Sequence, residues 1–179
     1  MKPVEVLGVR VESPGNQPVV LLKEVGGSRM LPIWVGAAEA AAIAYAQQGV
    51  DPPRPLTHDL FATVLSTMGH RLEAVHITEL RDNVFYAELH FEDGVIIESR
   101  PSDAIALALR VAAPVFGDDT LFEEVGVSVP EELASGSTSQ VSVPEEELEA
   151  FKEFLDQVSA DDFGTDVGSS EESGGDPPE

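Results

Sequence analysis

The chain has 179 residues, enough for one compact domain with additional segments, and 42% of them are hydrophobic, which suffices for a core. The absence of cysteine excludes disulfide bonds and thiolate metal sites, and no apolar run approaches the roughly 18 residues of a membrane-spanning helix. A formal net charge of −23 argues against the basic face with which nonspecific nucleic-acid-binding proteins contact phosphates. The first residues lack the apolar stretch of a signal peptide, so a cytoplasmic location is the default expectation.

The negative charge is concentrated in the last quarter of the chain. Residues 1–130 contain 9 Lys or Arg and 18 Asp or Glu, whereas residues 131–179 contain 1 and 15. We therefore predict a folded domain over residues 1–130 and a Ser/Gly-rich linker over residues 131–143. An acidic amphipathic helix over residues 144–160 and a disordered acidic tail over residues 161–179 are predicted to follow.

The first 35 residues predict a meander of three strands. Alternating apolar residues indicate a half-buried strand over residues 4–12, and a second strand covers residues 18–24 after a turn rich in Pro and Gly. A third, short strand covers residues 31–35. Because proline has no N–H for a ladder hydrogen bond, Pro32 places this strand at a sheet edge or at its own start.

Two helices follow the first meander. Residues 36–49 are rich in alanine and end at Gly49, the residue type that most often terminates a helix. A stiff proline-rich connector, which contains Arg54, leads to a second helix that extends to about Met68. Thr57 is the predicted N-cap of this second helix.

Residues 72–80, 84–92 and 95–99 predict a second meander, whose strands are joined by two tight turns. If Asp82 and Asn83 form a two-residue loop, His76 faces Leu89 across the hairpin and lies on the apolar face. We interpret His76 as a satisfied core histidine, and His70 and His90 as facing solvent.

The segment from Ser99 to Pro114 predicts a buried helix with a polar start. Pro101 suits the first helical position, and Pro114 stops the helix. The residues between them are apolar nearly all round, which is typical of a buried helix. A short extended piece and a helical turn capped by Asp118 complete the domain.

These elements predict an α+β fold. Its mostly antiparallel or mixed sheet is built from two meanders, residues 4–35 and 71–100, and the Ala-rich helices are buried against that sheet.

No phosphate-binding loop, dinucleotide fingerprint, zinc-ligand spacing or serine-nucleophile turn occurs in the sequence. The candidates for chemistry are polar residues where elements begin or end: Glu39, Arg54, His58, Asp59, Glu98, Arg100, Ser102 and Asp103. Carboxylates suit Mg²⁺ or Mn²⁺, and the planar guanidinium of arginine binds phosphate at two points. The same residues also suit helix caps and ion pairs, and both interpretations remain open at this level.

Three segments resemble the ordered motifs of the bifunctional nuclease family. They are LPIWVG at residues 31–36 followed by Glu39-Ala40, RPLTHDL at residues 54–60, and RPSDAIALA at residues 100–108. The resemblance covers roughly residues 3–130. It implies a compact α+β domain, degradation of DNA and RNA, and assembly into a homo-oligomer.

The resemblance and the side-chain chemistry together predict phosphodiester hydrolysis assisted by Mg²⁺ or Mn²⁺, in which a bound cation activates water. The predicted catalytic residues are Asp59, Asp103 and His58; the predicted substrate-binding residues are Arg54, Arg100 and Ser102; the predicted metal ligands are Glu39, Asp59, Glu98 and Asp103. The alternative is a non-catalytic regulatory or scaffolding domain that binds a protein partner or a small anion. Convergence of the predicted residues in space favours the enzyme, and isolated helix caps favour the alternative.

Overall fold

Eight strands form one mixed sheet in the part of the chain that the structure, a computed structural model, describes: residues 1–12, 15–50 and 52–128. The strands are β1 (Lys2–Glu12), β2 (Gln17–Glu24), β3 (Arg29–Trp34), β4 (Leu72–Arg81), β5 (Val84–Phe91), β6 (Ile96–Ser99), β7 (Val115–Gly117) and β8 (Val127–Ser128). Their order across the sheet is β6-β5-β4-β7-β1-β2-β3-β8. The predicted linker, acidic helix and acidic tail lie outside the described residues.

Both predicted meanders are present, and one short strand joins them into a single sheet. Neighbouring strands are antiparallel within β1-β2-β3 and within β4-β5-β6. Strand β7, predicted only as a short extended piece, pairs antiparallel with β1 and parallel with β4. The α+β class and the mixed sheet are therefore confirmed.

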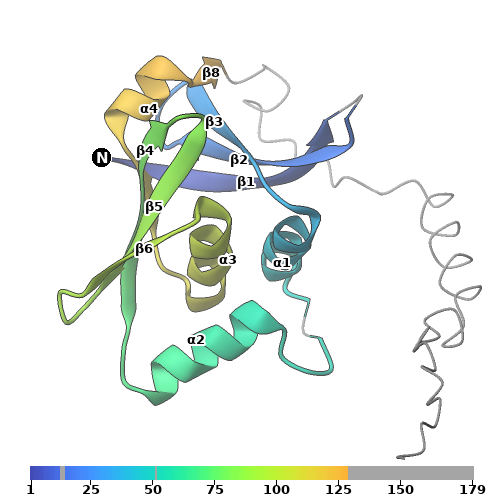
Figure 1. Cartoon of the computed structure of the whole chain (residues 1–179), viewed down its shortest axis with the longest axis vertical. Helices are drawn as coiled ribbons and strands as arrows, with labels where there is room; N and C mark the ends of the chain where they lie inside the picture. The colour runs from blue at the N-terminus through green and yellow to red at the C-terminus, as the bar shows by residue number, and fades with distance from the viewer. Residues whose placement is uncertain (13–14, 51, 129–179) are drawn as a thin grey trace, which may run out of the picture. The chain divides into compact units, whose positions relative to one another are not determined.

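The described residues also form four helices: α1 (Ala37–Gln48), α2 (Thr57–Thr67), α3 (Pro101–Val111) and α4 (Asp119–Glu124). Helices α1 and α3 contact each other and the strands, and α2 packs against α3 below them in the view of Figure 1. No helix in the described part of the chain has the length and apolar character needed to cross a membrane.

The buried character of α3 is confirmed. Its residues from Ala104 to Ala108 expose at most 1% of their surface, and they pack with sheet residues such as Val75 and Leu89. Pro101 is the first helical residue, as predicted. The helix ends before Pro114, because Ala112 already adopts a left-handed backbone conformation with φ 55°.

Two local predictions concern caps and edges. The predicted N-cap Thr57 is wrong: Leu56 is the N-cap of α2, and Thr57 is the first helical residue. The Asp59 carboxylate accepts a hydrogen bond from the Leu56 N–H at 2.8 Å, which supplies the capping interaction. Pro32 does lie near an edge: among the residues that the structure describes, β8 pairs with the first two residues of β3 and not with Pro32.

The hairpin of β4 and β5 departs from the predicted register at Thr78. The turn forms at Asp82 and Asn83 as predicted, but Thr78 is an extra residue in β4, so that His76 lies opposite Glu88. A one-residue shift moves a side chain to the other face of a sheet. The interpretation of His76 as a core histidine facing Leu89 is therefore wrong.

Candidate functional site

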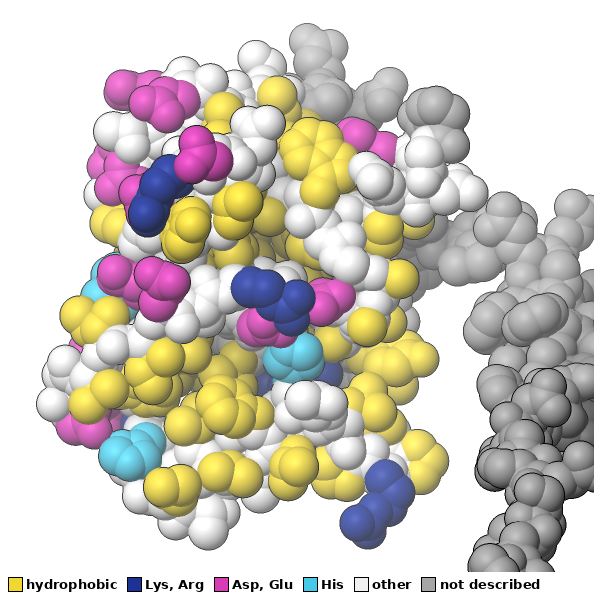
Figure 2. All heavy atoms as spheres, in the orientation of Figure 1, with side chains coloured by type: hydrophobic (Ala, Val, Ile, Leu, Met, Phe, Trp, Pro, Cys, Tyr) yellow, Lys and Arg dark blue, Asp and Glu magenta, His cyan; other side chains and the backbone are white. Residues whose placement is uncertain are grey.

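Four polar side chains meet at the N-terminal end of α3, and we call this group the Asp103 cluster: Glu39, His58, Arg100 and Asp103. Glu39 lies in the first turn of α1, His58 in the first turn of α2 and Asp103 in the first turn of α3. Arg100 is the N-cap of α3, directly after β6. In the space-filling view, charged side chains of both signs lie together with a histidine near the middle of the visible face (Figure 2).

Arg100 holds the two carboxylates of the cluster together. Its Nε lies 2.7 Å from Asp103 Oδ2, and its Nη2 lies 3.1 Å from Asp103 Oδ1 and 2.9 Å from Glu39 Oε1. The contact with Asp103 is bidentate, which is the geometry in which guanidinium groups bind carboxylates and phosphates. His58 Nε2 lies 3.1 Å from Asp103 Oδ1 and completes the group.

The cluster has a buried side and an open side. The side chains of His58 and Glu39 are 16% and 19% exposed, whereas that of Arg100 is 66% exposed. Partial burial acts to raise the pKa of Asp103, but the hydrogen bonds from Arg100 and His58 together outweigh it and hold that pKa below its ordinary value of 3.8. Asp103 is therefore ionised at neutral pH, and the exposed guanidinium of Arg100 lies between it and solvent.

A groove of about 380 Å³ lies beside Arg100 and Ser102. Ser102 is buried, and Trp34 and Phe85 form part of the wall. Trp34 leaves 54% of its surface exposed, although it is the largest kind of apolar side chain. From the sequence, Trp34 is predicted to lie in a strand and has no predicted role; the signal for it was a single tryptophan close to the helix start at Gly36.

The Asp59 side chain forms its hydrogen bonds and its ion pair with residues outside the Asp103 cluster. One carboxylate oxygen accepts from Arg110 Nε and the other from the Leu56 N–H. The hydrogen bond from Arg110 is the main reason why the pKa of Asp59 lies below 3.8. Arg110 also donates to the carbonyl oxygens of Ala42 at 3.0 Å and Ala106 at 2.8 Å, so the pair joins α1, α2 and α3. The catalytic and metal-binding roles of Asp59 stay predictions.

Two further predicted residues are not brought into the cluster. Arg54 is exposed in the connector before α2, and no ion pair or hydrogen bond of its side chain is found within the described residues. Glu98 is exposed on β6 and pairs in register with Glu88 of β5. Ladder partners share a face, so Glu98 lies on the side of the sheet opposite to α3.

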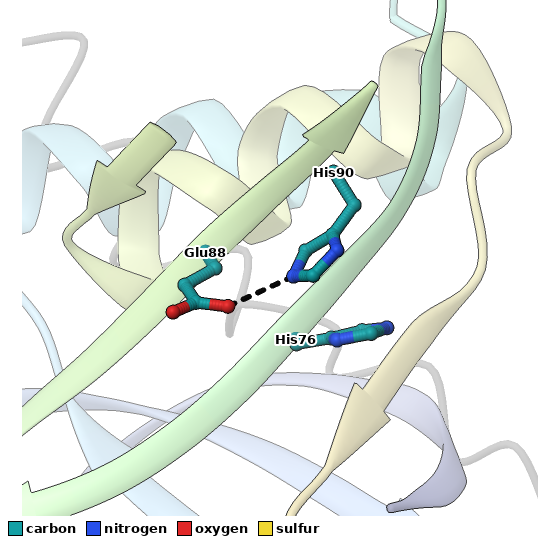
Figure 3. Close-up of side chains that lie close together, drawn as sticks. All are labelled: His76, Glu88 and His90. Atoms are coloured by element: carbon teal, nitrogen blue, oxygen red, sulfur yellow. Dashed lines mark hydrogen bonds and ion pairs between the residues drawn. The ribbon is translucent and has the colours of Figure 1, made fainter. Parts of the chain in front are cut away.

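A second group of side chains lies on that opposite face: His76 of β4 with Glu88 and His90 of β5. We call it the His76 cluster. Figure 3 shows the three side chains on the same side of the hairpin, with the Glu88 carboxylate turned toward His90. Burial and then the charge of His90 lower the pKa of His76. The spacing of Glu88 and His90 on one strand face was a signal for this group, but the bulge at Thr78 concealed the third member.

Comparisons with known proteins add a family assignment to this geometry. Residues 20–130 match the bifunctional nuclease domain. The chain is 50% identical over 163 residues to an uncharacterized protein of Mycobacterium tuberculosis, covering 91% of this chain and 98% of that protein. It is 28% identical over 116 residues to Bifunctional nuclease 1 of Oryza sativa subsp. indica and 29% identical over 106 residues to Bifunctional nuclease 2 of Arabidopsis thaliana. These alignments cover 62% and 56% of this chain, but only 35% and 32% of the plant proteins.

Proposed function

The chain belongs to the bifunctional nuclease domain family, and on this premise we propose that it hydrolyses phosphodiester bonds of DNA and RNA at the Asp103 cluster. The observation that carries the proposal is the exposed guanidinium of Arg100, which lies between Glu39, Asp103 and the groove at the start of α3. Predicted residues from three separate segments converge there, which favours the enzyme over isolated helix caps.

Arg100 is the proposed phosphate-binding residue. Its planar guanidinium already makes a bidentate contact with a carboxylate, and a phosphate group offers a similar pair of acceptor oxygens. The first turn of α3 adds the positive end of a helix dipole, which favours an anion at this place. Ser102, buried beside Arg100, lines the same groove and is the second proposed substrate contact.

His58 is the proposed general base, and Asp103 orients it. A carboxylate only accepts hydrogen bonds, so His58 donates its Nε2–H to Asp103 Oδ1. The Nδ1 lone pair is then free to take a proton from the attacking water. The hydrogen bond also stabilises the imidazolium that forms after the proton transfer.

The proposed cofactor is Mg²⁺ or Mn²⁺, for which Glu39 and Asp103 offer the carboxylate oxygens that these ions prefer. Such an ion, held by Glu39 and Asp103, would supply positive charge that offsets the charge developing on the phosphate. Both carboxylates contact Arg100, and the exposed position of Arg100 allows it to turn toward a phosphate and release them.

Trp34 is the proposed base-stacking residue. It is exposed on the wall of the groove that begins at Arg100, and stacking on an aromatic ring is available to every base. A contact of this kind does not distinguish DNA from RNA, in keeping with a nuclease that acts on both. Binding is expected to be weak, because the chain as a whole is acidic.

The test is cleavage of single-stranded DNA and RNA by the full chain, with Mg²⁺, with Mn²⁺ and with chelator. We expect His58→Gln and Asp103→Asn to lower the rate by about 100-fold or more, the range typical of a lost general base. Arg100→Lys should retain more activity than Arg100→Ala, since it keeps the charge and loses the two-pronged grip.

His70→Gln is the matched control, because His70 also contacts a carboxylate, Asp93, at 3.0 Å but lies outside the cluster. It should cleave at the wild-type rate. Normal cleavage by both His58→Gln and Asp103→Asn, in protein that melts as the wild type does, would refute the assignment. Cleavage that is unchanged by chelator would refute the metal assistance but not the assignment of His58 and Asp103.

One observation bears on the alternative, a non-catalytic regulatory or scaffolding domain that binds a protein partner or a small anion, because it favours a protein partner. Helix α2 has no buried residue, and three large apolar side chains on it, Leu60, Phe61 and Val64, are exposed, as is Met68 at its C-cap. Yellow side chains cover this part of the face in Figure 2. The homo-oligomer predicted from the family resemblance is therefore proposed to use α2. Light scattering of the wild type against a Leu60→Glu variant tests this: a monomer in both cases refutes it.

A further inference from the structure

The His76 cluster is built by the irregularity in β4. Without the extra residue Thr78, His76 would point toward the helices, as the regular register requires. With the bulge, His76 pairs with Glu88, and His90 follows two residues later on the same face of β5. The neighbouring residues Val75 and Leu89 point to the other side and are buried under the helices.

The three side chains lie close enough to share one ion. Each offers one ligand atom, and these atoms lie within 4.8 Å of one another. His90 Nε2 is already 2.8 Å from Glu88 Oε2. Tetrahedral coordination at the usual bond lengths near 2.1 Å places ligand atoms about 3.4 Å apart, so an approach of about 1.4 Å at most is needed.

The rings are held in place by their packing. The centroids of His76 and His90 lie 4.0 Å apart, and the rings of His76 and Phe116 of β7 form a T-shaped pair with centroids 5.3 Å apart. All three side chains of the cluster are partly buried, with His90 24% and Glu88 38% exposed. The ligands therefore need little further ordering, yet an ion can reach them from solvent.

The donor set selects the class of metal. Two imidazoles and one carboxylate suit Zn²⁺ and the neighbouring first-row transition ions, whereas Mg²⁺ and Ca²⁺ prefer sites made entirely of oxygen. Glu98, the ladder partner of Glu88, adds a further negative charge on this face. A cation is therefore favoured both by the ligands and by their surroundings.

We propose that His76, Glu88 and His90 form a binding site for one Zn²⁺-type transition-metal ion, with a fourth coordination position open to solvent. The site lies on the face of the sheet opposite to the Asp103 cluster and does not depend on the proposed nuclease function. A metal bound there ties β4 to β5 beside the bulge.

The full chain is first stripped of metal with chelator and then kept in excess Mg²⁺. It is titrated with Zn²⁺, followed by calorimetry, and with Co²⁺, followed by visible absorption. Excess Mg²⁺ occupies weak carboxylate sites elsewhere in this acidic chain. We expect one Zn²⁺ per chain, ligand-field bands of Co²⁺ with nitrogen ligands, and a higher midpoint of thermal unfolding in the presence of Zn²⁺.

Each single loss of a ligand, in His76→Gln, Glu88→Gln or His90→Gln, should weaken Zn²⁺ binding by more than about 10-fold. Removal of a residue that merely hydrogen-bonds to a metal ligand already weakens metal binding by about 10-fold, so loss of the ligand itself should weaken it further. His70→Gln, which alters an exposed His–Asp pair of two members, is the matched control and should bind as the wild type does. His58→Gln reports in the same way on the Asp103 cluster.

The proposal is overturned if the wild type binds Zn²⁺ no better than the His76→Gln/His90→Gln double variant. It is equally overturned if His70→Gln or His58→Gln alone removes the binding. Melting of each metal-free variant shows whether it is folded, and Glu88→Gln keeps the shape of the side chain. Because cleavage is not measured, failure here leaves the proposed nuclease function standing, and the reverse also holds.

Discussion

Replacing Arg110 by methionine should destabilise the domain strongly, although Arg110 lies outside the proposed catalytic groups. The Arg110 side chain is only 9% exposed, and it contacts Asp59 and the carbonyl oxygens of Ala42 and Ala106. Methionine keeps most of the apolar stem but provides no donor. Asp59 would then retain its charge with the Leu56 N–H as its remaining hydrogen-bond donor.

The magnitude follows from the burial of the pair. Removing one partner of a buried ion pair costs about 3–5 kcal/mol, because the other charge stays without compensation. Asp59 keeps 27% of its side-chain surface exposed, so water offsets part of this loss. We expect the free energy of unfolding to fall by about 3 kcal/mol, which corresponds to a melting point lower by roughly 10 °C for a domain of this size.

The loss should depend on pH in a defined direction. Because Arg110 holds the folded-state pKa of Asp59 below 3.8, the pair contributes its full stability above the unfolded-state pKa. That contribution disappears as the pH falls through the folded-state pKa. The difference between wild type and Arg110→Met should therefore be constant near neutral pH and shrink below about pH 4.

Urea unfolding of the wild type and Arg110→Met at several pH values tests this reasoning. Arg71→Met is the matched control, because Arg71 pairs with Glu92 at 3.2 Å while 78% of its side chain is exposed. It should unfold at the wild-type urea concentration. Equal stability of Arg110→Met and the wild type at neutral pH, or a difference that persists unchanged in acid, would refute the argument.

The other predictions concern the bulge and a close backbone contact. Deleting Thr78 should remove the bulge, turn His76 toward the helices, abolish Zn²⁺ uptake and lower the free energy of unfolding by about 3 kcal/mol, measured by urea unfolding and calorimetry. In Gly126→Ala, the added Cβ would overlap the carbonyl oxygen of Phe122, so we expect a loss of about 1–3 kcal/mol in the same unfolding assay. Gly15→Ala, whose Cβ would have its nearest neighbour at 3.7 Å, should be nearly neutral by comparison.

Much of the fold can be predicted from local patterns of apolar and turn-forming residues. The apolar stretch after Pro101 predicts the buried helix, and the alternation around Asp82-Asn83 predicts the hairpin, because both are set by neighbouring residues. The polar residues at helix starts are also predicted in this way, and the packing of α3 against α1 and α2 brings four of them together.

The features that escaped prediction depend on long-range contacts or on one irregular residue. Asp59 is a predicted metal ligand, but its carboxylate forms an ion pair with Arg110, which lies 51 residues later in the chain. The spacing of the two residues in the sequence does not indicate this pair. The bulge at Thr78 leaves both strands looking regular, since threonine is common in strands. Once it shifts the register, His76 changes face, and a candidate metal cluster appears where the sequence predicted core.

The local charge of the Asp103 cluster explains how so acidic a chain could bind a phosphodiester. The first turns of α1, α2 and α3 meet there, through Glu39, His58 and Asp103, and each helix start carries roughly half a positive charge. Together with Arg100 these ends offset the two carboxylates, which leaves the site close to neutral or slightly positive while the chain carries −23. Since the excess negative charge is concentrated in residues 131–179, their removal should strengthen nucleic-acid binding at low salt and leave it unchanged at high salt. Equal affinity of the full and the shortened chain at low salt would show instead that the field at the site is set by its own residues alone.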